Sequence, residues 1–363
     1  MAEEFLGTPD YKHGTPDRIG VLLLNLGTPD APNRPALRRY LKEFLSDRRV
    51  IEVPKLLWQA ILRGVILNIR PQRVAKDYQE IWMEEGAPLL VYGKRQRDKL
   101  QARLDAQNPD TWKVALGMRY GNPSVKSALM ELKEANCQKI VVLPLYPQYS
   151  AATTASTFDA VVNELTSWRL VPEMRFINNY YEEPTYLQAM VNSIQEHWDE
   201  HGRGQKLLFS MHGMPLEYLQ KGDPYHCLCH KSARLIAEKL GLERDQWEVS
   251  FQSRFGPAEW LKPYTDKRME ALPGEGIKSL DVVCPGFSTD CLETIEEIGE
   301  ENREYFEEAG GETFHYIPCL NDRDDHMDAL LDVVNKHTQG WRIMTETELK
   351  ISHEEAIAKG SKQ

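Results

Sequence analysis

Short runs of apolar and β-branched residues alternate with amphipathic stretches along most of the chain. The runs that predict strands lie at 19–26, 112–116, 139–144, 174–177, 206–210, 248–252, 280–284 and 313–317. Helical spacing of apolar residues is clearest over 124–136, 186–198, 231–241 and 291–310. A strand and a helix recurring every ~30 residues predict βα units, and therefore parallel sheets covered on both faces.

Eight such strands fit two doubly wound, Rossmann-like α/β domains better than a single (β/α)₈ barrel. The strand spacing is irregular and residues 27–111 hold a long, mostly helical insertion, although a barrel stays open as an alternative. We expect a flexible leader (1–17), an N-terminal domain (18–168), a C-terminal domain (169–323), a helix packing back on the N-terminal domain (324–340) and a polar tail (341–363).

Composition narrows the class of partner. The net charge of −11 and the pI near 5.5 argue against nucleic acid, whose phosphates call for a basic face. The N-terminus lacks the pattern of a signal peptide, and no apolar run approaches the ~18 residues needed to cross a bilayer. We therefore expect a cytoplasmic protein whose six scattered cysteines are free thiols.

Gly, Pro, aromatic and ionisable residues gather directly after the predicted strands. These strand exits are Gly27-Thr28-Pro29, Arg119-Tyr120-Gly121, 146–150, His212-Gly213, 252–254, 285–287 and Pro318-Cys319. Ligands of open α/β sheets bind at the carboxyl ends of the strands. Loops collect Gly and Pro for conformational reasons alone, but the set as a whole predicts one ligand cleft.

The stretch "SMHGMPLEYLQKGDPYHCLCH" (210–230) is the densest in potential metal ligands. His212 follows a predicted strand and precedes Gly, so its imidazole is expected in the cleft. Residues 226–230 alternate His, Cys, Leu, Cys and His, a spacing that suits neither a helix nor a strand face. No second ligand pair is present, which argues against a structural zinc site there.

A second candidate is "CPGFSTDCLETIEEIGEENREYFEEAG" (284–310). Asp290 is expected to cap the helix that follows it. Six glutamates then share one face of an ideal helix: Glu293, Glu297, Glu300, Glu301, Glu304 and Glu308. The glutamates of the later turns are compatible with an ordinary solvated surface. Glu293 differs because it lies in the first turn of the predicted helix, at the end of the domain that faces the cleft. A carboxylate facing an imidazole can hold a divalent cation weakly and take up protons.

Six motifs occurring in order carry a resemblance to a known family. They are "LLNLGTPD", "GMRYGNPS", "LPLYPQYSAATTAS", "SMHGMP…GDPY", "FQSRFGPAEWLKPYTD" and "CPGFSTDCLETIEEI". From about residue 18 to about residue 337, the chain resembles ferrochelatases of the proteobacterial type. The resemblance implies two Rossmann-like domains around a porphyrin cleft, the chelatase fold. It also implies insertion of Fe(II) into protoporphyrin IX with release of two protons, the last step of haem biosynthesis.

The resemblance assigns roles to individual positions. The metal-site histidine and its carboxylate partner match His212 and Glu293, and a route for incoming metal matches Glu297 and Glu301. Positions that contact the porphyrin, or lie beside the metal-site carboxylate, match Leu26, Arg119, Tyr146, Trp260, Phe287 and Asp290. Many relatives have His where this chain has Cys291, so a mechanism that needs that second histidine is excluded.

Residues 56–69, "LLWQAILRGVILNI", follow Lys55 and precede Arg70 and Arg73. Two interpretations of this segment are open. It can be an ordinary core helix, or, as the resemblance implies, an apolar lip over the cleft that touches a membrane surface peripherally.

The expected partners are protoporphyrin IX and Fe(II), without a required cofactor. One arrangement of a [2Fe–2S] cluster in the family uses C-terminal cysteines, and no cysteine follows Cys319 in this chain. The other cysteines include one Cys-x-Cys spacing without a clear partner pair, which also argues against a cluster.

Two other functions remain compatible with these motifs. One is a related chelatase that acts on another tetrapyrrole or metal, such as cobalt and a corrin precursor. Such relatives tend to have further histidines in the second half, which residues 284–298 lack. The other is a non-catalytic haem or porphyrin carrier, which would have no need of Glu293 opposite His212.

Overall fold

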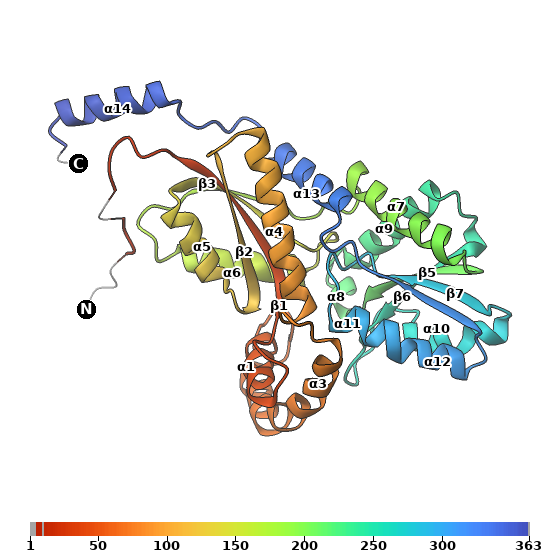
Figure 1. The fold of residues 1–363 in the computed structure, drawn as a ribbon. Helices are drawn as coiled ribbons and strands as arrows, with labels where there is room; N and C mark the ends of the chain where they lie inside the picture. Colours follow the sequence, from red (N-terminus) through yellow and green to blue (C-terminus); the bar gives the residue numbers. More distant parts are fainter. Residues whose placement is uncertain (1–4, 9–10, 362–363) are drawn as a thin grey trace.

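Two four-stranded sheets form the frame of the molecule (Figure 1), whose computed structural model describes residues 5–8 and 11–361. The first sheet has the order β2-β1-β3-β4 and the second the order β6-β5-β7-β8. The strands are β1 (Arg18–Thr28), β2 (Trp112–Gly121), β3 (Cys137–Pro144), β4 (Glu173–Phe176), β5 (Lys206–His212), β6 (Trp247–Gln252), β7 (Ser279–Val283) and β8 (Thr313–Ile317). All neighbours are parallel. The predicted doubly wound α/β class is therefore confirmed, and the single barrel is excluded.

Both sheets have the same strand order, with the first strand in chain order lying between the second and the third. The connections leave such a central strand in opposite directions, which opens a crevice at its carboxyl end. In the second sheet that strand is β5, and its last residue is His212. The topology thus puts the predicted metal-site histidine at the expected binding position.

Helices cover both faces of each sheet (Figure 1). Those of the first half are α1 (Arg34–Phe44), α2 (Lys55–Ile61), the π-helical η1 (Leu62–Ile66), α3 (Leu67–Ile81), α4 (Pro88–Gln107), α5 (Val125–Glu134), the π-helical η2 (Ala151–Ala155) and α6 (Ser156–Leu165). The second half has α7 (Pro184–His201), α8 (Leu216–Gln220), α9 (Tyr225–Lys239), η3 (Arg244–Gln246), α10 (Thr265–Ala271), η4 (Leu272–Glu275), α11 (Leu292–Ile295), the π-helical η5 (Glu297–Glu301), α12 (Asn302–Glu308), α13 (Asp324–His337) and α14 (Glu346–Ala358).

Side chains of β5 alternate between two cores, as the pleat of a strand requires. Leu207, Phe209 and Met211 pack in a cluster with residues of α7 and α9. Leu208 packs on the other face, with residues of α10 and α12. His212 has the parity of Leu208 and therefore lies on the face of α10 and α12.

The first sheet ends later than the sequence predicted. We expected the C-terminal domain to begin at residue 169, but β4 pairs with β3 from Lys139 and Glu173 to Val142 and Phe176. Residues 166–172 come before β4 and were expected to join the two domains. They are instead the loop that connects α6 to the edge strand of the same sheet.

The two ends of the chain are only partly as expected. Within the expected leader, residues 1–4 and 9–10 lie outside the described residues, and Leu6 pairs with the backbone of Ser167 and Arg169. The polar tail contains α14, because Thr345 caps the helix and Glu348 completes the capping box. Residues 362–363 lie outside the described part.

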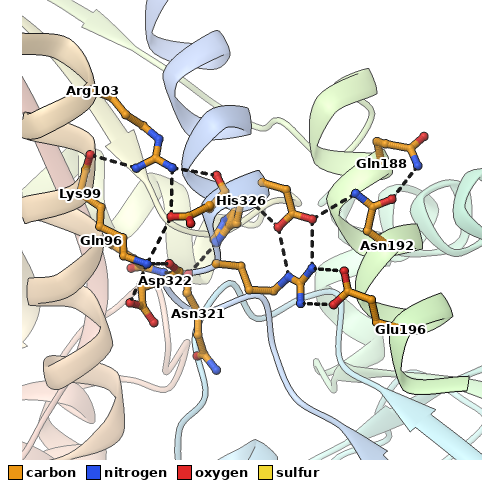
Figure 2. A network of polar contacts seen from close by, with 12 residues as sticks. Gln96, Lys99, Arg103, Gln188, Asn192, Glu196, Asn321, Asp322 and His326 are labelled. Atoms are coloured by element: carbon orange, nitrogen blue, oxygen red, sulfur yellow. Dashed lines mark hydrogen bonds and ion pairs between the residues drawn. The ribbon is translucent and has the colours of Figure 1, made fainter. Parts of the chain in front are cut away.

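The predicted helix after residue 323 is α13, which packs against both α4 and α7. Figure 2 shows the polar network at this junction, with α4 contributing Gln96, Lys99 and Arg103. The Gln96 amide donates to Thr289 Oγ1 at 3.0 Å and to the Asn321 carbonyl at 2.9 Å. A buried side chain of the first half therefore fixes the loop that precedes α11.

Replacing Gln96 by Leu is expected to lower the free energy of unfolding by about 1–3 kcal/mol, because the Asn321 carbonyl and Thr289 hydroxyl lose a buried donor. Urea unfolding followed by circular dichroism measures the effect. Gln107→Leu, at an exposed position of the same helix, is the control for altered helix propensity. An unchanged midpoint for Gln96→Leu would show that this contact does not join the two halves.

Candidate active site

His212 ends β5, and the position of its proton follows from its hydrogen bond to Gly213. Its Nδ1 lies 2.6 Å from the Gly213 carbonyl oxygen, which can only accept. Nδ1 therefore carries the proton, and Nε2 keeps its lone pair. Burial lowers the pKa of His212 below the usual imidazole value, while Glu293 and the Gly213 carbonyl act in the opposite direction. The imidazole is thus neutral at pH 7 and can accept a proton or bind a metal.

Glu293 lies in the first turn of α11. Its charge raises the pKa of His212 and also acts on Tyr40 and Tyr78, two buried phenols of α1 and α3. Leu292 and Ile295 pack on the same helices. The carboxylate therefore lies between the two halves of the protein, and the structure brings together His212 and Glu293, 81 residues apart in the sequence.

The predicted helix cap at Asp290 is wrong by one residue. Cys291 occupies the cap position. Asp290, 4% exposed, instead accepts hydrogen bonds from Thr294 Oγ1, Tyr316 Oη, Asn321 Nδ2 and the Cys319 backbone. Its carboxylate therefore fixes the start of α11, on which Glu293 stands.

Gln252 supports the site, and the sequence analysis placed it at a strand exit without assigning it a role. It pairs in register with His212 on the neighbouring strand and is 2% exposed. Its amide donates to the Glu293 carbonyl at 2.5 Å and more weakly to Glu297 Oε2 at 3.4 Å, and it accepts from Ser210 Oγ at 2.7 Å. Gln252 therefore holds the backbone that carries Glu293 at a fixed position beside β5.

Glu297 begins a π-helical turn and is held by Ser253. The backbone N–H and hydroxyl of Ser253 donate to its two carboxylate oxygens at 2.6 and 2.5 Å. Burial nevertheless raises the pKa of Glu297 to about 7, with a contribution from Glu293. The predicted route residue therefore takes up or releases a proton close to neutral pH.

The expected single acidic face over 293–308 is wrong, because η5 interrupts the predicted helix 291–310. The Glu301 N–H bonds to the Glu296 carbonyl, five residues back. One extra residue in the turn rotates the later side chains by about 100° relative to an uninterrupted α-helix. Glu301 accepts from Tyr305 at 2.7 Å, whereas Glu304 and Glu308 are exposed.

Glu296, outside the predicted face, belongs to the acidic group as well. Burial raises its pKa to about 7, and the carboxylates of Asp77, Glu301, Glu300 and Glu80 add to the shift. Asp77 and Glu80 belong to α3, in the first half of the protein. Carboxylates from both halves therefore gather behind Glu293, and a cation would relieve their mutual repulsion.

Aromatic side chains with unpaired polar atoms lie beside the His–Glu pair. The Tyr146 hydroxyl and the Trp260 indole N–H are buried without a hydrogen-bond partner among the described residues. A Cβ on Gly213 would lie 3.1 Å from the Trp260 ring, so that ring packs directly after His212. The Phe287 ring is centred 6.3 Å from the His212 ring. These residues could form the walls of a site for a flat ligand.

Arg119 opens onto a cavity of about 510 Å³, lined by Arg39, Lys42, Glu43, Ser46, Asp47 and Arg119. Its guanidinium donates to Asp47 at 2.5 Å and to Ser156 at 2.7 Å. Asp47 was not found from the sequence, since it lies in the long insertion, far from any predicted strand end. Leu26, near the end of β1, packs partly buried on the α1–α3 core.

The "HCLCH" stretch lies in α9, away from these groups. Cys229 is fully buried, whereas Cys227 is exposed, so the helix points the two thiols in different directions. The rings of His226 and His230 instead lie near Phe251. The stretch therefore belongs to the packing between α9 and the second sheet.

Comparison with known proteins identifies the family of the chain. The Ferrochelatase family model matches residues 18–338. The chain is 58% identical over 337 residues to a ferrochelatase of Thioalkalivibrio sulfidiphilus (93% of this chain, 91% of the relative) and 54% identical over 357 residues to one of Marinobacter nauticus (98% and 96%). The solved sirohydrochlorin chelatase SirB of Bacillus subtilis shares the fold at a TM-score of 0.50 and 8% identity, with 88% of this chain and 95% of that chain covered. The chain belongs to the ferrochelatase family.

Proposed function

We propose that the protein inserts Fe(II) into protoporphyrin IX and releases protohaem and two protons. The observation that carries this proposal is the neutral His212 imidazole facing Glu293, with an acidic group behind the carboxylate. Membership of the ferrochelatase family supports it. A carrier would have no use for this pair of groups.

The chemistry requires a proton acceptor and weak metal ligands. Two pyrrole N–H protons must leave before iron can occupy the macrocycle. His212 Nε2 has one lone pair and accepts them one at a time, passing the first proton to solvent before it takes the second. Carboxylates such as Glu293 and Glu297 bind a dication through exchangeable oxygen ligands, whereas thiolates would hold the metal too tightly. Burial and Glu293 raise the pKa of Cys291, so this thiol stays protonated and does not compete.

The macrocycle is proposed to lie between the aromatic walls and the first half of the protein. Tyr146, Trp260 and Phe287 contact its plane, and Leu26 approaches the opposite face. Arg119 binds a propionate carboxylate, for which its fork of N–H donors is suited. Asp290 contributes indirectly, because its hydrogen bonds fix the start of α11.

The deciding experiment mixes the purified protein with protoporphyrin IX and Fe(II) without oxygen and follows the change from free-base to metalloporphyrin absorption. Enzyme-dependent formation of protohaem with multiple turnovers is expected. Parallel reactions with coproporphyrin III, and with Co(II) and a corrin precursor, test the other chelatase functions. Porphyrin binding without turnover would instead identify a carrier.

Glu297 is expected to make the reaction pH-dependent near neutrality. Its carboxyl is protonated below its pKa of about 7 and binds cations only when ionised. The KM for Fe(II) should therefore fall as the pH rises from about 6 to about 8. In Glu297→Gln that dependence should flatten, while the exposed Glu308→Gln should keep it. Equal slopes in all three proteins would exclude Glu297 from the metal route.

We also propose that the lip, residues 56–69, touches a membrane surface. No helix in the described part of the chain is long and apolar enough to cross a membrane. The lip nevertheless exposes Leu56 by 89%, Ile69 by 69% and Leu57 by 57%, and peripheral contact of this apolar face would suit a poorly soluble substrate and product. Double substitution of Leu56 and Leu57 by Ser should reduce co-sedimentation with anionic vesicles. Unchanged sedimentation would contradict the contact.

The reaction as proposed requires no resident cofactor, including no [2Fe–2S] cluster. Cys137, Cys229, Cys284, Cys291 and Cys319 are buried, and Cys227 is exposed. Burial raises the pKa of each buried thiol, which disfavours the thiolates that a cluster needs. Charge-transfer bands in the visible spectrum of the purified protein would contradict this.

A further inference from the structure

A group of potential metal ligands lies between α7 and the second sheet. His197 comes from α7, Asp281 from the middle of β7 and His315 from the middle of β8, where the two strand residues pair in register. One ligand atom of each lies within 4.8 Å of the other two. His201, one helical turn after His197, adds a fourth ring, centred 4.6 Å from His197 and 5.9 Å from His315.

This group is separate from the active site. Asp281 alternates with Leu280 and Val282, which pack against α10 and α12, so its side chain points to the opposite face, that of α7. Asp281 pairs with Leu207 of β5, five residues before His212, which corresponds to about 16 Å along the strand. The two sites therefore lie on opposite faces of the sheet and at different heights.

Asp281 is already oriented as a ligand. The residue is 0% exposed, and its Oδ2 accepts from the Trp198 indole and from the Gly204 N–H, both at 2.7 Å. A Cβ at residue 204 would lie 2.9 Å from this carboxylate, so glycine is needed for the approach. These bonds leave Oδ1 for His315, and hydrogen bonds of this kind fix ligating carboxylates in metal sites.

His197 supplies the independent observation. Its Nε2 is buried and has no hydrogen-bond partner among the described residues. A buried polar nitrogen without a partner is unfavourable. A bound cation would satisfy it, since a neutral imidazole nitrogen is a common metal ligand.

The distance between two of the ligand atoms suits a small tetrahedral ion. Zinc holds nitrogen and oxygen ligands at about 2.0–2.1 Å, which separates two ligand atoms by about 3.3 Å in a tetrahedron. His315 Nδ1 lies 3.1 Å from Asp281 Oδ1. A hydrogen bond would give the same distance, so the unpartnered His197 is what favours a metal.

We propose that His197, Asp281 and His315, with His201 as the fourth ligand, form a Zn²⁺ site that links the end of α7 to the edge of the second sheet. Nitrogen-rich ligand sets with one carboxylate favour zinc and its transition-metal neighbours over Mg²⁺ or Ca²⁺. The ion ties a helix to two strands, so its role is structural.

The test uses the full-length protein carrying His212→Ala, a substitution that impairs metal binding at the active site. A chelator first removes any bound metal from this protein. Titration with Zn²⁺ by calorimetry, and with Co²⁺ by its visible absorption, should show one equivalent bound with the intense bands of a tetrahedral ion. His197→Gln, added to that background, should weaken binding at least about tenfold. His226→Gln, which alters a half-buried histidine outside the group, should leave it unchanged.

A second measurement guards against misfolding of the variant. In the otherwise unaltered protein, His197→Gln should retain the rate of metal insertion into porphyrin and lose only the rise in melting temperature that Zn²⁺ causes. An equal zinc affinity and an equal thermal shift with and without His197 would overturn the proposal. So would a metal-free protein that binds no equivalent of Zn²⁺ or Co²⁺ outside the active site. The zinc affinity and the thermal shift do not depend on which porphyrin or metal the enzyme uses.

Discussion

Substituting His212 by Ala is expected to reduce the rate of Fe(II) insertion by at least about 10²-fold, the usual contribution of a positioned general base. The structure gives the reason. Nδ1 is committed to the Gly213 carbonyl, so Nε2 is the nitrogen with a free lone pair, and the lowered pKa keeps the ring neutral. Alanine leaves neither an acceptor for the pyrrole protons nor a nitrogen ligand for iron. Anaerobic turnover assays measure the loss.

Porphyrin binding separates this role from a collapse of the cleft. Tyr146, Trp260 and Phe287 remain in place when the imidazole is removed, so quenching of protein fluorescence by protoporphyrin IX should give a Kd close to that of the parent. His230→Ala, which alters a histidine of α9 near Phe251, should retain full turnover. Turnover by His212→Ala at the parent rate would remove the residue from the reacting centre.

The fold followed from the sequence because its signal is local. β1 is a continuous apolar run in which Val21 to Leu24 are fully buried, as expected for a strand covered on both faces. The seven other strands were found by the same alternation of strand and helix. The end of the first sheet was misplaced because the pairing of β4 with β3 depends on a contact that no local pattern encodes.

The site was predictable only where a residue stands at a strand exit or matches a family motif. His212, Phe287 and Trp260 meet those conditions. Gln252 also follows the pattern, at the end of β6, but nothing local shows that its amide reaches the backbone of Glu293 from the neighbouring strand. Asp47 becomes visible only when the insertion folds back on Arg119.

The π-helical turn could not be predicted, because helical spacing presumes 3.6 residues per turn. Glu297 turns to Ser253, while Glu296 joins the carboxylates of α3. The proposed metal route therefore involves carboxylates of two segments from different halves of the protein instead of one face of a single helix. Two carboxyls whose pKa values are about 7, Glu296 and Glu297, therefore follow Glu293 in the chain, and the charge of Glu293 acts on Glu297.

Glu293→Gln is expected to lower the rate of insertion by about 10²-fold and to raise the KM for Fe(II), since an amide has similar shape but no charge to attract a dication. The Gln252 contact is to the backbone and survives, so the position of α11 should not change. The charge of Glu293 raises the pKa of His212; its removal lowers that pKa further and makes the imidazole a weaker base.

Two features of the Glu293→Gln kinetics distinguish loss of this charge from general damage. The part of the pH–rate profile that belongs to His212 should move to lower pH, because a group with a lowered pKa becomes protonated only at higher acidity. Glu308→Gln, at an exposed position of α12 outside the acidic group, should change neither the rate nor the profile. If Glu293→Gln kept the parent rate and KM across the pH range, the carboxylate would not act on the metal, and the acidic group behind it would lose its role as a metal route.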